Sequence, residues 1–219
     1  AQPPLAKLVA TDAQADDNFG YAVAISADTV LVGSWQEDGA ANATPDSGAA
    51  YVFNRNQGGA NAWGQVKKLT AVTPVAGDRF GASVALDVDT AVIGAPFGND
   101  NGNDSGAAYV FERNQGVANQ WGNTRKLMPT NDAGESNSAG DNFGISVGVS
   151  GNKILVGAFR DEAGNNVDAT ADLGSAYLFD RNLGGAGNWG LVSKLLASDR
   201  ARGDLFGSSV AINGDRLAV

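Results

Sequence analysis

One unit recurs four times along this chain, and it limits the fold more than any other feature does. The dipeptide Phe-Gly stands at residues 19, 80, 143 and 206, so the period is about 60 residues. An aspartate precedes each Phe by two positions, as in Asp78-Arg79-Phe80-Gly81. A fixed period of this length indicates a repeat architecture in which each unit is one supersecondary structure.

Each complete period contains four short segments with the character of β-strands, separated by turns rich in Gly, Asn and Asp. In the first period these segments cover residues 19–25, 29–33, 49–53 and 65–71. A sustained 3.6-residue pattern is missing throughout, so we expect almost no helix. The sequence therefore predicts an all-β chain built from four-stranded repeats.

The repeated segments resemble FG-GAP repeats, which build the β-propeller of integrin α-subunits and occur in many bacterial secreted and cell-surface proteins. The resemblance rests on Phe-Gly, on Ile93-Gly94-Ala95-Pro96 and on Gly106-Ala107-Ala108-Tyr109-Val110-Phe111, which recur in fixed order. It implies one domain over residues 1–219, a β-propeller-type array of four-stranded antiparallel blades. Three full blades are expected at 17–71, 78–128 and 141–197, and parts of another at 204–219, to which an N-terminal strand at 7–10 would belong.

The expected array is open at both ends, because the partial blade lacks its third strand. We expect either that the chain is part of a longer propeller or that its open blade edges pair with other copies in a self-assembly, since natural proteins rarely expose long unpaired edges.

Composition excludes several classes of chemistry. The chain has no cysteine and no histidine, so it can hold neither a thiolate or imidazole metal site nor a Ser-His-Asp triad. The net charge of −9 argues against nucleic acid as a partner, because such binding depends on Lys and Arg. The apolar runs are too short to cross a bilayer, so no membrane insertion is expected.

In a four-stranded meander, the connections between strands two and three and between successive blades emerge on one face. Most acidic residues fall in these connections, whereas only Arg79, Arg160, Arg200 and Arg202 share them. The acidic residues concerned are Asp12, Asp16, Asp17, Glu37, Asp38, Asp46, Asp78, Asp100, Asp104, Asp132, Glu135, Asp141, Asp161, Glu162, Asp168, Asp172, Asp199 and Asp204. Such a face attracts divalent cations or a basic partner.

Calcium is the cation that this face would take, and oxygen-bearing side chains cluster most closely in one loop. The candidate ligands are Asp100, Asn101, Asn103 and Asp104. The alternative is that Asp and Asn form turns here, since Asp46, Asp104 and Asp172 each precede a repeated Gly by two residues. The integrin-type calcium loop is not expected, because the connection between strands one and two is as short as Ser26-Ala27-Asp28.

Residues that differ between the repeats are the candidates for ligand binding. They lie in the loops after the second strand: Trp35, Glu37, Asp38, Phe159, Asp161 and Glu162. An aromatic residue there could stack on a sugar ring, although packing between blades is the alternative. An Arg and a Trp recur at equivalent points as Arg55 and Trp63, Arg113 and Trp121, Arg181 and Trp189, and we expect them to stabilise the turn before the fourth strand.

These observations predict a non-enzymatic, extracellular or cell-surface module for binding or adhesion, with a protein or glycan of a cell surface or matrix as partner. One alternative is a calcium-stabilised building block of a surface layer or filament. Another is a lectin-like glycan binder or a hydrolase that uses paired acids such as Asp161 and Glu162 with Asp100.

Overall fold

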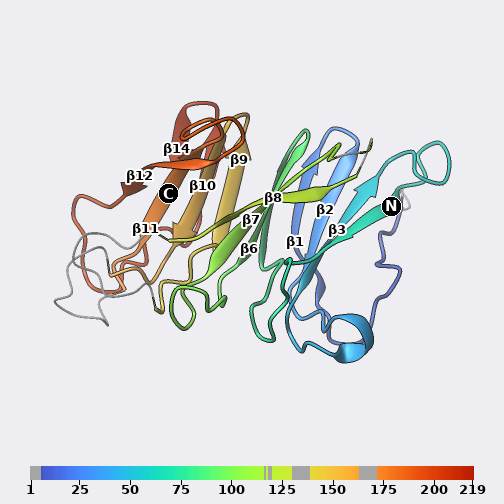
Figure 1. The fold of residues 1–219 in the computed structure, drawn as a ribbon, viewed down its shortest axis with the longest axis horizontal. Helices are drawn as coiled ribbons and strands as arrows, with labels where there is room; N and C mark the ends of the chain where they lie inside the picture. The colour runs from blue at the N-terminus through green and yellow to red at the C-terminus, as the bar shows by residue number, and fades with distance from the viewer. Residues whose placement is uncertain (1–5, 116, 118–119, 130–138, 163–171) are drawn as a thin grey trace, which may run out of the picture.

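The computed structural model describes residues 6–115, 117, 120–129, 139–162 and 172–219. Three four-stranded antiparallel sheets and one two-stranded sheet make up the described part of the chain (Figure 1). Blade 1 contains β1 (Phe19–Ser26), β2 (Thr29–Ser34), β3 (Ala49–Asn54) and β4 (Gly64–Leu69). Blade 2 contains β5 (Ser83–Asp87), β6 (Thr90–Ala95), β7 (Ala107–Glu112) and β8 (Gly122–Leu127).

Blade 3 contains β9 (Ser146–Ser150), β10 (Lys153–Ala158), β11 (Ser175–Asp180) and β12 (Gly190–Leu195). The half-blade consists of β13 (Ala211–Asn213) and β14 (Arg216–Ala218). Strands follow one another as a meander in every blade, so the predicted all-β architecture with three full blades and part of another is confirmed. One short 3-10 turn, Ala40–Asn42, is the helical element of the described residues.

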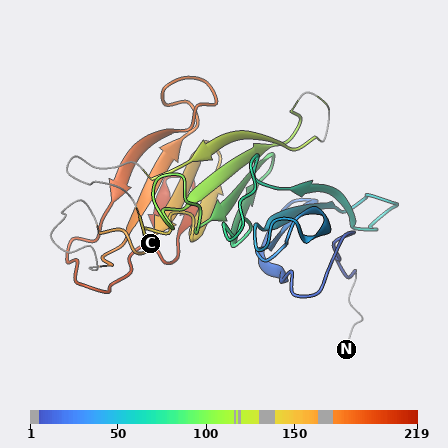
Figure 2. The ribbon, with the colours of Figure 1, turned by 60° about the horizontal axis from the view of Figure 1, so that its bottom comes forward.

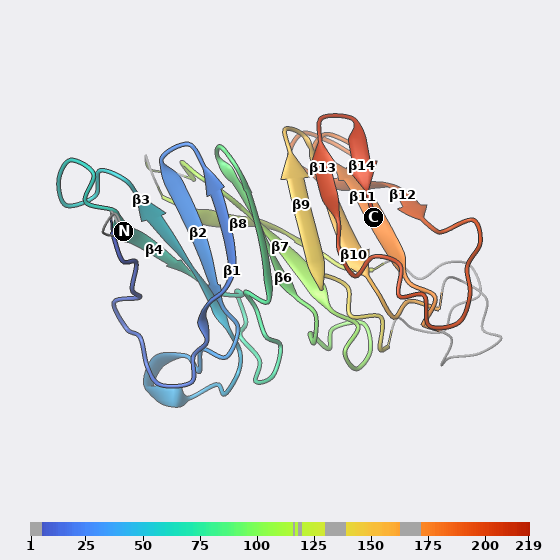
Figure 3. The ribbon, with the colours of Figure 1, turned by 180° about the vertical axis from the view of Figure 1, so that it is seen from behind.

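The first strands of successive blades, β1, β5, β9 and β13, lie next to one another along one side of the array. Figure 3 shows β1, β9 and β13 in this order, and Figure 2 shows the blades fanning out from that side. The fourth strands β4, β8 and β12 are the outer edges. This arrangement is the radial one of a β-propeller.

Aromatic residues of one kind fill the space between blades. Phe80 is fully buried and packs edge-on against Phe111 of β7, with ring centroids 6.0 Å apart. Phe143 is also fully buried and makes the same contact with Phe179, at 6.1 Å. The Phe of each Phe-Gly is therefore a core residue at a blade junction.

Glycines let the backbones of neighbouring blades touch. A Cβ on Gly94 would lie well inside 3.0 Å of the carbonyl oxygen of Gly144, and a Cβ on Gly157 would meet Gly207 in the same way. Neither glycine has a positive φ, so close approach of another backbone is the reason for glycine at both sites.

Residues 7–10, predicted as an N-terminal strand, form no backbone ladder with any of the described strands and are not a strand in the structure. Leu8 and Ala10 instead pack on the cluster of Tyr51 and Phe53, on the side of blade 1 that faces away from blade 2. The segment thus covers the outer part of blade 1. In the same way β4 covers the outer part of blade 2, because Leu69 of β4 belongs to the core cluster between blades 1 and 2.

Candidate functional site

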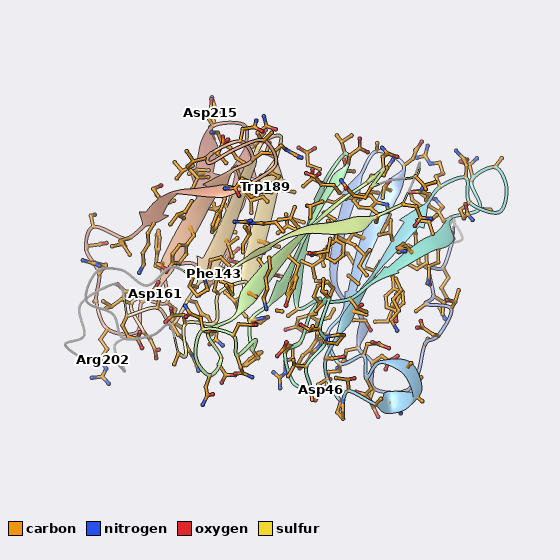
Figure 4. The ribbon with its side chains drawn as sticks, viewed as in Figure 1. Asp46, Phe143, Asp161, Trp189, Arg202 and Asp215 are labelled. Carbon is orange, nitrogen blue, oxygen red and sulfur yellow. The ribbon has the colours of Figure 1, made fainter. Side chains whose placement is uncertain are left out.

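The connections between the second and third strands and those between blades emerge together at one end of the array, which we call the loop face. Figure 4 shows Asp46, Asp161 and Arg202 at this end and Asp215 at the opposite end, which we call the hairpin face. The prediction that these two sets of connections share a face is confirmed by the hydrogen bonds between them.

Backbone hydrogen bonds hold each loop of a blade to the segment that enters the next blade. At the first junction the amide N–H of Phe80 donates to the carbonyl oxygen of Ser47 at 2.9 Å, and Gly77 donates to Pro45 at 2.9 Å. At the second junction Phe143 donates to Ser105 at 3.0 Å. The loop face therefore stands on a backbone scaffold that repeats from blade to blade.

Three aspartates of this face are turn residues. Asp46, Asp104 and Asp172 have φ angles of 52°, 53° and 44°, in the left-handed region that Asp and Asn tolerate best after glycine. Each stands two residues before a glycine whose φ is 81° or 82°: Gly48, Gly106 or Gly174. The interpretation of these residues as one recurring turn is confirmed.

Buried charge is the feature of this face that the sequence did not suggest. The carboxylate of Asp161, 1% exposed, accepts hydrogen bonds from the hydroxyls of Ser175 at 2.5 Å and Tyr177 at 2.6 Å. It also pairs with the ammonium group of Lys194 at 3.1 Å. The signal was present in the sequence, because a Tyr of the third strand and a Lys of the fourth recur in each blade.

Blade 1 has an equivalent group. Glu37, 3% exposed, pairs with Lys68 at 2.5 Å, and Lys68 also pairs with Asp12 at 2.6 Å. Two of the acidic residues proposed as ligand contacts, Glu37 and Asp161, thus have their carboxylates bonded inside a blade. They stabilise the loops rather than project from them, so we leave them out of the candidate binding surface.

The other predicted contact residues lie closer to solvent. Asp38 accepts the amide N–H of Asp46 at 2.8 Å and is half-buried. Phe159 is half-buried, and the guanidinium carbon of Arg160 lies 5.3 Å from the centroid of its ring. Glu162 is also half-buried. Asp168, like Asp132 and Glu135, lies outside the described residues.

Trp35 belongs to a stack of side chains that crosses the junction of blades 1 and 2. The guanidinium carbon of Arg79 lies 4.4 Å from the ring centroid of Trp35 and 4.4 Å from that of Phe97. Tyr21, 62% exposed, packs on Trp35 with the ring centroids 5.2 Å apart. We call Tyr21, Trp35, Arg79 and Phe97 the aromatic–arginine stack.

The stack is specific to this junction, because the other repeats have Asn18, Asn142 and Leu205 where blade 2 has Arg79. The contacts of the Trp35 ring are packing contacts at the junction between blades. Such packing is the alternative that was considered for this residue. Neither Arg79 nor Phe97 was among the predicted ligand contacts, although both differ from the residues at the same positions of the other repeats, and this difference was the available signal.

The loop of the predicted calcium ligands is closed by hydrogen bonds of its own. The carboxylate of Asp100 pairs with Lys126, and the side-chain oxygen of Asn99 accepts the amide N–H of Asp104 at 2.8 Å. Asn101 donates from its side chain to the carbonyl oxygen of Pro129 at 3.3 Å, while Asn103 contributes its backbone carbonyl to the second junction. Among the described residues, no group of three or more acidic side chains is arranged to hold a metal ion.

Asp78 precedes the second Phe-Gly and is 3% exposed. Burial raises the pKa of its carboxyl group to about 6; the positive charge of Lys126 opposes this rise, and the negative charge of Asp100 adds to it. Its Oδ1 atom accepts no hydrogen bond in the structure. A raised pKa can mark an active site, but this carboxylate is enclosed within a blade junction.

On the hairpin face the recurring Arg and Trp are in contact. The guanidinium carbon of Arg181 lies 4.6 Å from the ring centroid of Trp189, and its Nη2 donates to Thr90 of blade 2 at 2.6 Å. Arg113 makes the equivalent bond to Thr29 of blade 1, also at 2.6 Å. The predicted role in the turn is supported, and the arginines also join successive blades.

The fold and the junctions define the class of this protein: a propeller-type array of four-stranded blades linked through Phe-Gly segments. The family model of the FG-GAP repeat matches residues 5–53, 63–111, 121–179 and 189–219, and the chain belongs to the FG-GAP repeat family. The matched segments 63–111 and 121–179 each begin at the fourth strand of one blade, β4 or β8, and run into the third strand of the next, so each of these two spans a junction. A comparison with curated proteins found no match.

Proposed function

We propose that this chain is a non-enzymatic extracellular binding module whose loop face attaches to a protein of a cell surface or matrix. A β-propeller-type binding or structural module is what the FG-GAP repeats indicate. The extracellular location rests on the family, which is typical of secreted and surface proteins. The described residues include no helix long and apolar enough to cross a membrane.

The observation that carries the proposal is the aromatic–arginine stack. Trp, Tyr and Arg are the residue types that contribute most to binding energy in protein interfaces. Here they are held against one another across a blade junction, so little side-chain freedom remains to be lost when a partner binds. A protein surface is therefore a better match than a glycan, which remains the alternative partner.

The scaffold supports the same function. Loops 35–48 and 96–106 differ in sequence and length, yet each is bonded to the following blade through the same backbone positions. A rigid frame that carries variable loops is the usual arrangement of binding proteins.

The hydrolase alternative lacks support from the described geometry. Asp100 pairs with Lys126 in blade 2, whereas Asp161 pairs with Lys194 in blade 3. Each carboxylate is neutralised by the lysine of its own blade, and a general acid and base would have to share one substrate. We therefore propose no catalytic role for this pair.

The test is binding of the purified chain to a panel of immobilised matrix proteins and to a glycan array. Trp35→Ala is the test variant and Trp63→Ala the matched control, because Trp63 stacks on Arg55, 5.6 Å away, on the hairpin face. We expect a protein ligand whose affinity falls at least tenfold with Trp35→Ala and less than twofold with Trp63→Ala.

Equal loss with both variants would assign the effect to stability rather than to a site. Binding only to glycans would replace the proposed partner by the alternative. Absence of binding to every probe would contradict the proposal.

A further inference from the structure

The arginines that join successive blades on the hairpin face differ in their partners. At the junction of blades 2 and 3, each nitrogen of the Arg181 guanidinium group has a partner. Its Nε donates to the side-chain oxygen of Asn152 at 3.1 Å, and its Nη2 donates to the hydroxyl oxygen of Thr90 at 2.6 Å. Its Nη1 donates to the carboxylate of Glu112. A carboxylate of the preceding blade thus completes the contacts of this arginine.

Arg113 holds the equivalent position at the junction of blades 1 and 2, where its Nη2 donates to Thr29 at 2.6 Å. Its Nε lies 3.2 Å from the carboxylate of Asp89, an ion pair without the geometry of a hydrogen bond. The side chain of Asp89 is 53% exposed, so solvent screens this pair. The Nη1 of Arg113 has no hydrogen bond or ion pair with any residue that the structure describes. Blades 1 and 2 are both complete four-stranded sheets, so the difference is a property of this junction.

One residue of the third strand accounts for the difference. Asn54 is the last residue of β3 and is paired with Thr29 of β2. Glu112 is the last residue of β7 and has the equivalent pairing in blade 2. The side-chain oxygen of Asn54 accepts the hydroxyl of Thr29 at 3.0 Å. A short, uncharged amide thus stands where a carboxylate would otherwise reach Arg113.

A pocket of about 260 Å³ lies at this place. Its inner wall is formed by Thr29, Asn54 and Arg113. The rest of its wall is formed by Asp28, Arg55, Asn56 and Gln57. Arg55 pairs with Asp28 at 3.1 Å, so the arginine with a nitrogen left to bond is Arg113. The pocket is smaller than those of drug-sized ligands, about 300–1,000 Å³, and suits one sugar ring.

We propose that this pocket binds a sugar acid, a hexuronate unit whose carboxylate accepts the Nη1–H of Arg113 as Glu112 accepts that of Arg181. The side-chain amides of Asn56 and Gln57 both donate and accept hydrogen bonds, as the hydroxyl groups of a sugar require. The described residues that line the pocket include no apolar or aromatic side chain, which the anchor of a peptide would need.

Binding is measured by NMR on the isotope-labelled chain, with the backbone amides of residues 54–57 and 113 as reporters and the ionic strength held constant with NaCl. The probes are sodium glucuronate, glucose, sodium acetate and the amide of N-acetylaspartate. We expect glucuronate to bind in the millimolar range, as its small size dictates, and about tenfold more tightly than glucose, which lacks the carboxylate. Acetate should bind more weakly than glucuronate, because it lacks the hydroxyl groups.

Three results would overturn the proposal. The first is the absence of a chemical-shift change with glucuronate. The second is an affinity for glucose or acetate equal to that for glucuronate. The third is tighter binding of the aspartate compound, which would assign the pocket to a peptide carboxylate instead.

Asn54→Glu tests the place of binding, because it supplies the carboxylate that blade 2 has in Glu112. We expect this variant to bind glucuronate about tenfold more weakly, without a fall in melting temperature. The matched control is Asn182→Glu, which adds the same charge at an exposed position of the hairpin face in blade 3. Equal weakening by the two variants, or none by either, would overturn the assignment to this pocket.

Two more variants complete the test. Asp89→Asn removes a competing negative charge and should strengthen glucuronate binding about two- to fivefold. An unchanged or weaker affinity would contradict the role of Arg113. Trp35→Ala, on the loop face, should leave glucuronate binding unchanged, so the result does not depend on the function proposed for that face.

Discussion

The contact of Gly94 with Gly144 allows the sharpest test of how the blades are joined. A methyl group at position 94 would lie 2.9 Å from the carbonyl carbon of Gly144 and closer still to its oxygen, which is backbone and cannot rotate away. The two blades would have to separate by roughly 1 Å to restore ordinary contact. Overpacking of this kind costs about 1–3 kcal/mol.

A second loss follows from the same movement. The hydroxyl of Ser83 donates to the carbonyl oxygen of Gly144 at 2.7 Å, and separation of the blades weakens this bond, worth about 1 kcal/mol. The reduced freedom of the unfolded chain returns about 0.4–1 kcal/mol. We therefore expect Gly94→Ala to destabilise the protein by about 2–3 kcal/mol, or by roughly 5–10 °C in melting temperature.

The matched control is Gly98→Ala. Gly98 is buried and has no positive φ, and the nearest atom to an added Cβ is the carbonyl oxygen of Ala95 at 3.5 Å, an ordinary contact. Urea unfolding followed by tryptophan fluorescence measures both variants. Gly98→Ala should be neutral or slightly stabilising. Equal destabilisation by the two substitutions would refute the argument that backbone contact between blades requires glycine at position 94.

Three further predictions concern the charged groups. The pKa of Asp78 is raised from 3.8 to about 6, so its ionised form destabilises the folded state. Asp78→Asn should therefore raise the free energy of unfolding at pH 7 by up to about 3 kcal/mol. This gain should disappear as the pH falls from 6 to 4, because the Asp78 carboxyl group of the wild-type protein is then protonated as well. Lys194→Met should cost about 3–5 kcal/mol, because it leaves the buried carboxylate of Asp161 without its cation. A chelator should leave the melting temperature unchanged, because the carboxylate of Asp100 already pairs with a lysine.

Each of these has a control or a contrary outcome. Asp204→Asn is the control for Asp78, since it stands at the same repeat position but is exposed, and a similar gain from both would contradict the burial argument. Lys67→Met is the control for Lys194, since Lys67 makes a hydrogen bond of 3.4 Å to Gln120 at the surface. A fall of several degrees in chelator would instead support the calcium site that the sequence predicts.

The period of the sequence was sufficient to predict the blades, because every complete repeat contains the same four strand segments and the same turns. Phe80 and Gly81 could be assigned to a junction, since a residue pair that recurs with its strand context has a packing role. The N-terminal strand could not be judged in this way. Its side-chain pattern matched a fourth strand, but a strand also needs a neighbour to bond with, and pattern alone does not supply one.

The candidate site was less predictable, because charge was assigned from the loops in which the acids lie. Glu37 and Asp161 looked like surface acids, whereas Lys68 and Lys194 of the fourth strands neutralise them inside the blades. The contact of Trp35 with Arg79 joins residues far apart in sequence. Such a contact follows from the stacking of one blade on the next, which no single repeat reveals.

Backbone contacts between the blades join them into one rigid array. Native-state hydrogen exchange of the Phe80 and Phe143 amides, which donate across the first two junctions, tests it most directly. We predict that these amides exchange as slowly as those of the buried strands β6 and β10, through global unfolding alone. Faster exchange at the junctions, with β6 and β10 still protected, would show that the blades separate independently and would contradict the claim.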